Sequence, residues 1–368
     1  MRRNTILFIL LFPVMLFAQV NSSFYEHYTG LITEDLKLTA DLVKLENSFS
    51  GYYYYEFKEG EAWIASKPIA LDGQVDTQSE FVLNEFGDME SYFQGKLENQ
   101  KLINGQWHNK LLKEAVDFTL KATYPNGSMP MKVIETKKTK YFENNKSKPS
   151  ATFHISVLFP SVNLEQAVYH QLLQRIYHLI GFRGKLDNQK DIITALQDTY
   201  FKQFESSLAN IQLDSFPQSF KWIKNIRTDV INNEERILCL QVETYAKTGQ
   251  GEGSRVKKYL VFDIANNMVI KTKDLYTEDS KAQLLDILQE KIRTHYHIAQ
   301  ETQLTEAGFF QDSIAPTANF YVHPGGLGFY YNVYEIAPFS NGPTDLFIPW
   351  KDLKGILPED SALQALAR

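Results

Sequence analysis

The sequence predicts an α+β protein in two parts. An N-terminal antiparallel β meander or small barrel is followed by a C-terminal α+β domain with helices packed on an antiparallel sheet. Residues 24–136 consist of short alternating segments separated by turn residues, without a helical stretch. Residues 137–150 are charged and poor in apolar side chains, which is typical of a linker. Residues 151–368 combine helical periodicity with strands, which completes the expected domain organisation.

The first eighteen residues are typical of a signal peptide for secretion. Arg2 and Arg3 precede an apolar run from Ile6 to Phe17, and Ala18 is a plausible cleavage residue. The run is shorter than the ~20 residues that a membrane-spanning helix needs. Retention as an uncleaved anchor stays open, because Leu16 is a poor residue two positions before the cleavage site. We expect an exported protein, periplasmic or extracellular, with no transmembrane segment after signal cleavage.

The composition disfavours several classes of partner. The formal net charge is −6, and loss of Arg2 and Arg3 with the signal makes it about −8. An acidic chain without a basic stripe argues against nucleic acid and anionic membrane surfaces. The single cysteine, Cys239, cannot form an internal disulfide. Because it lies in an alternating apolar run, we expect a buried and inert thiol.

Short strands follow one another closely in the N-terminal part. Residues Leu36 to Leu42 alternate at period two, and Ser50 to Phe57 form an aromatic run that favours β-structure. Further short segments continue to Ala122, separated by turn signals such as Asn104-Gly105. This spacing predicts a meander that is strongly curved or closed into a small barrel.

The C-terminal part mixes helical and strand periodicity. Helices that are grouped apart from strands argue for an α+β domain and against a parallel, doubly wound sheet. In chain order, the expected elements are a strand over Thr152–Leu158, helices from about Asn163 to Gly181 and from Lys190 to Leu208, strands near Lys221–Ile231, Arg236–Tyr245 and Val256–Ile264, and a helix from about Asp279 to Thr294.

The stretch from Asn319 to Leu357 is the most distinctive part of the chain. Two apolar runs flank Pro324-Gly325-Gly326, which predicts a β-hairpin. A lone carboxylate, Glu335, follows in the segment Tyr334–Pro338. If this segment is a buried strand, Glu335 must accept a hydrogen bond, from a loop backbone or Asn332, or have a raised pKa.

The segment Phe329–Phe339, reading FYYNVYEIAPF, carries a family resemblance that Val242–Tyr245, Tyr259–Asp263 and Lys273–Leu275 support in the same order. The stretch Gln241–Leu357 resembles the extracytoplasmic domain of the RsiV-type anti-sigma factors, which is also the accessory module of the peptidoglycan deacetylase PdaC. It departs from that family at Thr248–Gly253, where the usual histidine is missing. The N-terminal part is similar to regions of exported Bacteroidetes proteins of unknown role.

The resemblance implies a ligand-binding module of the cell envelope, similar to one that recognises lysozyme. We expect neither a sigma-binding segment nor a deacetylase domain in this chain. The leading hypothesis is an exported, non-catalytic protein that binds a cell-wall glycan such as peptidoglycan, or a lysozyme-like protein. The expected binding residues are Tyr331, Asn332, Tyr334, Glu335, Pro338 and Phe339.

Catalytic and metal-binding motifs are weak or missing. Serine-hydrolase, zinc-protease, P-loop and dinucleotide fingerprints do not occur. The pair His295 and His297 has no third ligand at suitable spacing, so we expect no metal and no cofactor. The loop Gly249–Gly253 is more typical of a hairpin than of a phosphate site. The alternative function is an envelope glycan hydrolase that uses unrecognised carboxylates, for example Asp263 and Glu335.

Aromatic side chains are further candidates for sugar stacking or for anchoring a protein partner. Because strand side chains alternate between two faces, we expect about half of them to be core. The candidates are Tyr52 to Tyr55, Trp107, Phe329 to Tyr331, Tyr334 and Trp350.

Overall fold

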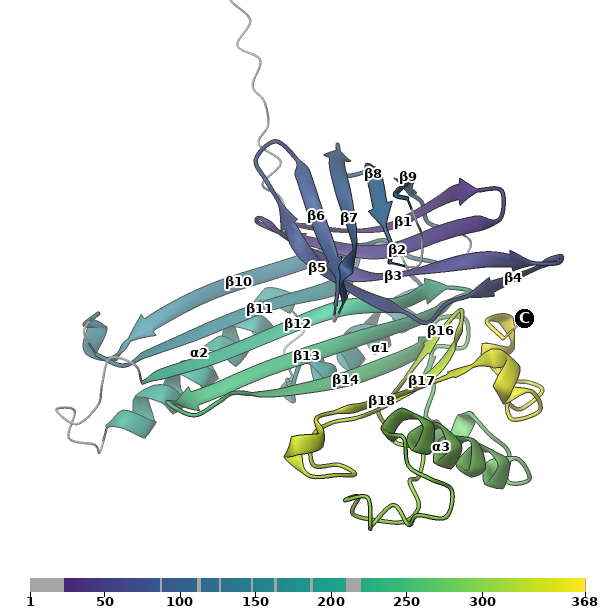
Figure 1. The fold of residues 1–368 in the computed structure, drawn as a ribbon. Helices are drawn as coiled ribbons and strands as arrows, with labels where there is room; N and C mark the ends of the chain where they lie inside the picture. The colour runs from purple at the N-terminus through teal and green to yellow at the C-terminus, as the bar shows by residue number, and fades with distance from the viewer. Residues whose placement is uncertain are drawn as a thin grey trace, which may run out of the picture.

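The computed structural model describes residues 23–86, 88–110, 114–125, 127–146, 148–161, 164–185, 188–209 and 220–367. The predicted signal peptide, residues 1–18, lies outside these ranges. The strands form three sheets of nine, six and three strands. Figure 1 shows the first sheet rolled up over one end of the long second sheet, with the C-terminal module beside it. The described chain is mostly β with three α-helices, which confirms the predicted α+β class.

An eight-stranded antiparallel barrel forms the N-terminal part and confirms the prediction of a meander or small barrel (Figure 1). Its strands pair in chain order, β4 is an additional strand on β3, and the barrel closes where Tyr28 and Thr29 of β1 pair with β9. The strands are β1 (Phe24–Thr33), β2 (Leu36–Leu45), β3 (Ser48–Glu59), β4 (Ala62–Ala65), β5 (Ile69–Val75), β6 (Glu80–Glu85), β7 (Asp88–Glu98), β8 (Leu102–His108) and β9 (Val116–Ala122).

Side chains fill the interior of the barrel. Phe93 stacks on Trp107 with ring centroids 5.6 Å apart, and Tyr53 meets Phe93 edge-on at 4.9 Å. The interior cavity lined by apolar side chains holds about 10 Å³, which is about one water molecule's worth of space. The barrel interior is therefore a packed core and leaves no room for a ligand.

The second sheet has the order β10-β11-β12-β13-β14-β15. Its pairs are antiparallel except for β11 and β12, which run parallel because α1 and α2 form the crossover between them. The elements are β10 (Met131–Tyr141), β11 (Ser150–Pro160), α1 (Gln166–Leu179), α2 (Gln189–Leu208), β12 (Lys221–Glu234), β13 (Ile237–Gly249), β14 (Ser254–Asp263) and β15 (Met268–Val269).

Helices α1 and α2 cover one face of this sheet. Gly181, at φ +93°, follows the end of α1, where a left-handed residue is needed. The Asn188 side chain caps α2 by accepting hydrogen bonds from the backbone N–H groups of Lys190 and Asp191. The predicted start near Asn163 falls on a residue outside the described ranges, and α1 begins after Glu165. The shared core includes Phe153, Ile155, Leu172, Ile176, Phe204 and Leu240.

The linker predicted over residues 137–150 is wrong. Residues Lys137–Tyr141 continue β10 and pair with Ser150–His154 of β11, and a short 3-10 turn, η1 (Phe142–Asn144), lies between the two strands. The lysines mislead because β10 is an edge strand, where charged side chains are common. The boundary between barrel and second sheet lies between Ala122 and Met131.

The C-terminal module contains the predicted hairpin, and its core packs on the second sheet. Apolar side chains of the sheet, such as Ile237 and Val261, join Leu288 and Phe329 of the module in one cluster. Cys239 is fully buried there, and burial raises the pKa of its thiol to about 12, as expected for an inert cysteine. The elements are η3 (Thr272–Asp274), α3 (Lys281–Tyr296), β16 (Phe320–His323), β17 (Gly326–Tyr331), η4 (Phe339–Asn341), β18 (Thr344–Pro349), η5 (Trp350–Leu353) and η6 (Ala362–Ala365).

The aromatic run of β3 joins the barrel to the second sheet. Tyr53 points into the barrel, whereas its neighbours point outward. The Tyr52 hydroxyl donates to Gln241 Oε1 at 2.9 Å, and the Tyr54 hydroxyl donates to Glu234 Oε1 at 2.8 Å. These tyrosines are structural, since their hydroxyl groups are used within the protein.

Candidate functional site

The segment of residues 332–343 between β17 and β18, called the contact loop from here on, contains most of the predicted binding residues. Ala337 is buried and fixes the middle of the loop in the core of the C-terminal module. Pro338 precedes the 3-10 turn η4, and Gly342 at φ +70° ends it. The loop is therefore a defined turn held at both ends.

Asn332 holds the contact loop against the free edge of β14. Its Oδ1 accepts from the Lys257 backbone N–H at 2.8 Å, and its Nδ2 donates to the Lys257 carbonyl at 3.1 Å. Asn319 acts in the same way beside it, accepting from the Tyr259 N–H at 3.1 Å and donating to the carbonyl of Lys257. Two side-chain amides thus replace a neighbouring strand, and Asn332 is a positioning residue for the loop.

Tyr334 and Phe339 form an exposed aromatic pair on the contact loop. Their side chains are 66% and 47% exposed, and their ring centroids lie 5.7 Å apart at an angle of 38°. Tyr334 has φ +66°, which is uncommon for a residue with a side chain and sets the direction in which its side chain leaves the backbone. Phe310 is also exposed, and its backbone N–H donates to Ile336 of the loop at 3.0 Å.

Two of the predicted site residues have environments that differ from the expectation. Glu335 does not lie in a buried strand: it is exposed on the turn, where its Oε1 accepts from Asn332 Nδ2 at 3.2 Å. The chain leaves the sheet at Tyr331, so the apolar segment around Glu335 is a loop. Tyr331 itself is buried and donates to the Ala315 carbonyl at 2.8 Å, so it belongs to the core.

Most of the other aromatic candidates are also core residues. Trp107 is inside the barrel, and Trp350 is largely buried with its indole N–H donating to the His323 carbonyl at 3.0 Å. Phe329 is fully buried. Among the aromatic candidates, Tyr334 is the one that presents most of its side chain to solvent.

Asp263 and Glu335, the carboxylate pair predicted for a hydrolase, do not face a common site. Asp263 is buried, and its two oxygens accept from the backbone N–H and the side-chain amide of Asn266 at 3.0 and 2.6 Å. Glu335 is exposed on the contact loop. Because both oxygens of Asp263 accept hydrogen bonds within a turn, these two carboxylates do not form a catalytic pair.

A buried ionisable cluster at the joint between barrel and sheet is the feature that sequence reasoning missed. His27 is fully buried, with Nδ1 2.8 Å from Asp41 Oδ1 and Nε2 3.7 Å from Glu234 Oε1. The Tyr25 hydroxyl also donates to Asp41, at 2.5 Å, and accepts from Asn233 Nδ2 at 3.0 Å. His27 and Asp41 are cross-strand neighbours in the β1–β2 hairpin, whereas Asn233 and Glu234 come from distant β12, and no local pattern predicts that second contact.

Burial and neighbouring charges act together on this cluster. Burial alone would lower the pKa of His27, but Asp41 and then Glu234 raise it above its usual value. Burial raises the pKa of Glu234, against the lowering effects of His27 and of the Tyr54 hydroxyl. The folded joint therefore favours the protonated forms of both groups.

Within the described ranges, no group of three or more His, Cys, Asp or Glu side chains could hold a metal ion. Among the helices of those ranges, none is both long and apolar enough to span a bilayer.

The fold and the contact loop define a β-rich protein with a filled barrel and a C-terminal α+β module that displays aromatic side chains. Residues 273–351, from η3 to η5, match the family model described as "Protein of unknown function (DUF3298)", so the chain carries a DUF3298 domain over these residues.

Solved structures of that family are similar to this chain. A DUF3298 family member from Bacteroides fragilis NCTC 9343 has 21% identity and a TM-score of 0.59 over 65% of this chain and 98% of its own. A DUF3298 family protein from Pseudomonas aeruginosa PAO1 has 18% identity and a TM-score of 0.44 over 63% of this chain and 95% of its own. No curated protein matches. The first likeness supports the fold, and the narrower RsiV-type resemblance stays a prediction.

Proposed function

We propose that the protein is an exported, non-catalytic binding protein of the cell envelope that recognises a lysozyme-like protein through its contact loop. The observation that carries the proposal is the exposed pair of Tyr334 and Phe339 on a loop that Asn332 clamps to β14. Large aromatic side chains held in a fixed geometry are typical anchors of protein interfaces. Little ordering free energy is lost when such a loop binds.

The charge around the loop favours a basic partner. Glu335 is exposed beside the aromatic pair, and the whole chain has a formal net charge of −6. Complementary charge raises the rate of encounter and selects among partners. A cationic lysozyme-like protein carries the opposite, complementary charge.

A cell-wall glycan is the second candidate ligand of the same loop. The exposed ring of Tyr334 is suited to stacking on the apolar face of a sugar, and Phe339 offers a second ring beside it. The same two side chains would then bind peptidoglycan, so one pair of substitutions tests both ligands.

Binding measurements with the chain lacking residues 1–18 test the proposal. Hen egg-white lysozyme and soluble peptidoglycan fragments serve as probes in separate titrations. In the double variant Tyr334→Ser with Phe339→Ser, we expect about tenfold weaker binding or more. Phe86→Ser is the matched control, because Phe86 is an exposed aromatic side chain (84%) on the barrel. The proposal is wrong if neither probe binds the unsubstituted protein, or if the double variant binds as well as the control.

The hydrolase alternative and the export step have their own tests. Turnover of peptidoglycan fragments that disappears in a folded Glu335→Gln variant would replace the non-catalytic proposal with a hydrolase. Export is measured by cell fractionation of the full chain, and deletion of residues 2–18 should leave the protein in the cytoplasm.

A further inference from the structure

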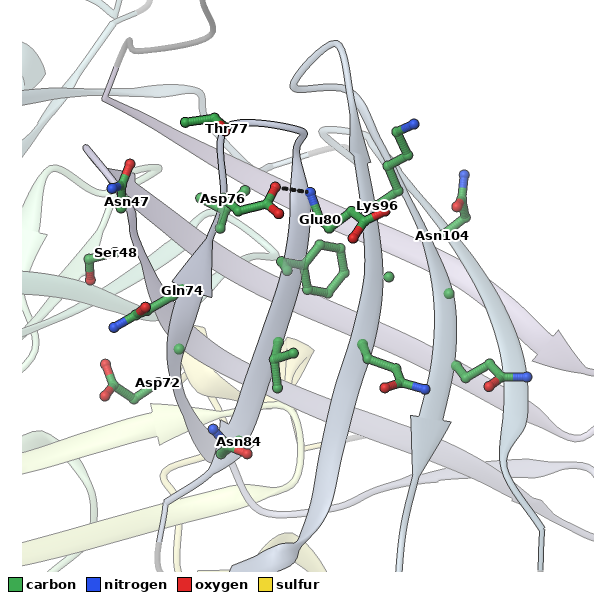
Figure 2. A pocket seen from close by; sticks show the side chains of 18 residues that line it. Asn47, Ser48, Asp72, Gln74, Asp76, Thr77, Glu80, Asn84, Lys96 and Asn104 are labelled. Carbon is green, nitrogen blue, oxygen red and sulfur yellow. Dashed lines mark hydrogen bonds between the residues drawn. The ribbon is translucent and has the colours of Figure 1, made fainter.

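A polar cavity of about 1310 Å³ lies on the outer face of the barrel, over β5, β6, β7 and β8. Figure 2 shows it from close by: the side chains of Asp72, Gln74 and Asn84 lie along β5 and β6, and those of Lys96 and Asn104 lie on the neighbouring strands. This cavity is called the polar trough from here on. It exceeds the ~300–1,000 Å³ typical of sites for single small molecules, so its size suits an oligomer.

Strand pairing arranges the side chains of the trough in rows. The outward residues alternate with interior residues such as Leu71 and Leu83. Neighbouring strands are ~4.8 Å apart, so groups in a row repeat at that spacing. The central row is Gln74, Val82, Gln94 and Gln106, and the row on one side of it is Glu80, Lys96 and Asn104.

Glycines provide the floor of the trough. A Cβ at Gly73, Gly95 or Gly105 would lie 1.8–2.0 Å from a carbonyl oxygen of the adjacent strand, so no other residue fits there. All three glycines line the cavity. Because they have no side chains, the adjacent strands can approach this closely, which is typical of glycines where a strand bends at a barrel corner.

Half of the polar side chains that line the trough are neutral amides. They are concentrated in the central row, where three of the four side chains are glutamines. An amide both donates and accepts hydrogen bonds, which matches the hydroxyl groups of a sugar. Val82 is 46% exposed in the same row and offers an apolar contact for a sugar ring.

The charge of the trough and its unpaired amides restrict the class of ligand that it can bind. The ionisable lining residues are Asp72, Asp76, Glu80 and Lys96, which sum to −3 + 1 = −2 and disfavour an anionic polymer. The side chains of Gln74 and Asn84 have no hydrogen-bond partner within the described ranges, so their amides are available to a ligand.

An aromatic pair adjoins the trough. The Tyr92 ring stacks on the His108 ring with centroids 4.3 Å apart and planes 10° apart, and Tyr92 pairs with Asn84 across β6 and β7. The Gln94 side-chain nitrogen lies 3.2 Å from His108 Nε2, which links this pair to the central row. Both rings are partly exposed and give a sugar a surface on which to stack.

We propose that the polar trough binds a neutral oligosaccharide. The rows of amides contact its hydroxyl groups, while Val82 and the adjoining Tyr92–His108 pair contact its apolar faces. This site is built on the barrel and does not depend on the contact loop, so it adds a second ligand to the one proposed above.

Calorimetric titration of the folded chain with cellohexaose, maltohexaose and chitohexaose tests the proposal. We expect at least one of these to bind, with a dissociation constant of roughly 10 μM to 1 mM. The variant Val82→Arg fills the middle of the central row, and Gln94→Ala removes a central amide; each should weaken binding about tenfold. Both positions are exposed, so folding should be retained, and circular dichroism checks this.

Lys121→Ala on β9 is the matched control, because Lys121 is exposed on the barrel but does not line the trough. An oligogalacturonate hexamer is the anionic control and should not bind. The proposal is overturned if none of the three neutral hexasaccharides binds, or if Val82→Arg and Gln94→Ala bind them as the Lys121→Ala protein does. The Tyr334 and Phe339 double variant should bind the sugar normally, so failure of the contact loop and failure of the trough give different results.

Discussion

The barrel and the C-terminal module both attach to the six-stranded sheet, but they attach through different chemistry. The C-terminal module uses apolar side chains such as Ile237 and Val261, together with the neutral amides of Asn319 and Asn332. The barrel adds the ionisable cluster around His27. Neutral contacts respond little to pH, whereas ionisable contacts couple attachment to proton binding. The C-terminal module also buries His323 and Asp345, whose pKa values burial lowers and raises, respectively. The difference therefore predicts that the two joints respond to pH through different groups, and that the loss of stability with rising pH above about pH 7 comes from the barrel joint.

Removing the aromatic centre of the C-terminal module should have the largest effect on stability. Phe329 is fully buried between the hairpin and the second sheet. Phe329→Ala leaves a cavity and should lower the free energy of unfolding by about 4 kcal/mol. Chemical denaturation measures this loss, and it should be the same at pH 5 and pH 8. A loss that changes strongly with pH would contradict the neutral character of this attachment.

Breaking the ionisable joint should have the next largest effect. Asp41 is 5% exposed and contacts both His27 and Tyr25. Asp41→Ala leaves these groups without their partner and should cost about 3 kcal/mol. Denaturation of this variant at pH 5 and pH 8 should give different losses. Equal losses at the two pH values would show that the cluster does not couple to protons.

The clamp of the contact loop should contribute less. Asn332→Ala removes hydrogen bonds to the backbone of Lys257 and to Glu335. We expect a loss of about 1–2 kcal/mol, since two backbone groups of β14 lose a partner. Hydrogen exchange should show faster exchange at Lys257 and in the loop, with the barrel unchanged. Unaltered exchange at Lys257 would mean that Asn319 holds this edge alone.

The pH dependence of the barrel joint has a defined sign. The folded-state pKa values of His27 and Glu234 are both raised, so the folded chain binds more protons than the unfolded chain. The contribution of His27 is fully present below its unfolded pKa of about 6.5 and is lost as pH rises through its folded pKa. The contribution of Glu234 to stability is lost in the same way as pH rises, starting from its unfolded pKa, which is lower than that of His27.

Thermal unfolding between pH 5 and pH 8 measures this effect. Stability should fall with rising pH by at most about 1.4 kcal/mol per pH unit for each proton released. In His27→Gln this slope should be smaller. Burial lowers the pKa of His323 to about 3, so between pH 5 and about 6.5 this second buried histidine binds a proton only in the unfolded chain and opposes the slope. Above about pH 7 it is neutral in both states, and the fall in stability due to His27 should be measured there.

The exposed pair of the contact loop should have the smallest effect on stability. Tyr334 and Phe339 lose little burial when they are truncated, because their side chains already face solvent. The double serine variant should unfold within about 0.5 kcal/mol of the unsubstituted protein. A larger loss, seen by denaturation, would assign these rings to the fold and would weaken their proposed role in binding.

Local patterns predicted the elements of this fold well where one face of an element is buried. The alternation from Leu36 to Leu42, the helix that ends at Leu208 and the hairpin at Pro324-Gly325-Gly326 all have strong local signals, and the structure contains each of them. The edge strand β10 was missed because its lysines are the same residues that occur in linkers.

The environments of individual side chains were harder to predict. The exposure of Glu335 depends on where the chain leaves the sheet, and the apolar sequence around it gave no sign of that point. The contact of His27 with Asp41 follows from the register of β1 and β2, but the approach of Glu234 depends on the placement of the barrel on the sheet. The amides of the polar trough are visible as alternation in single strands, but their rows exist only once the strands are paired.

The barrel closes along a short seam. β1 pairs with β2 at nine Cα positions but with β9 at only two, Tyr28↔Ala122 and Thr29↔Lys121. Few hydrogen bonds must break for the barrel to open between β1 and β9, so we expect local opening of the barrel to cost the least free energy at this seam. His27 lies next to it on β1, and the Thr123 N–H donates to its carbonyl at 2.9 Å. Opening of the seam would therefore first expose the barrel core beside Tyr28, whereas the His27 imidazole lies on the opposite face of β1, toward Glu234 of the second sheet.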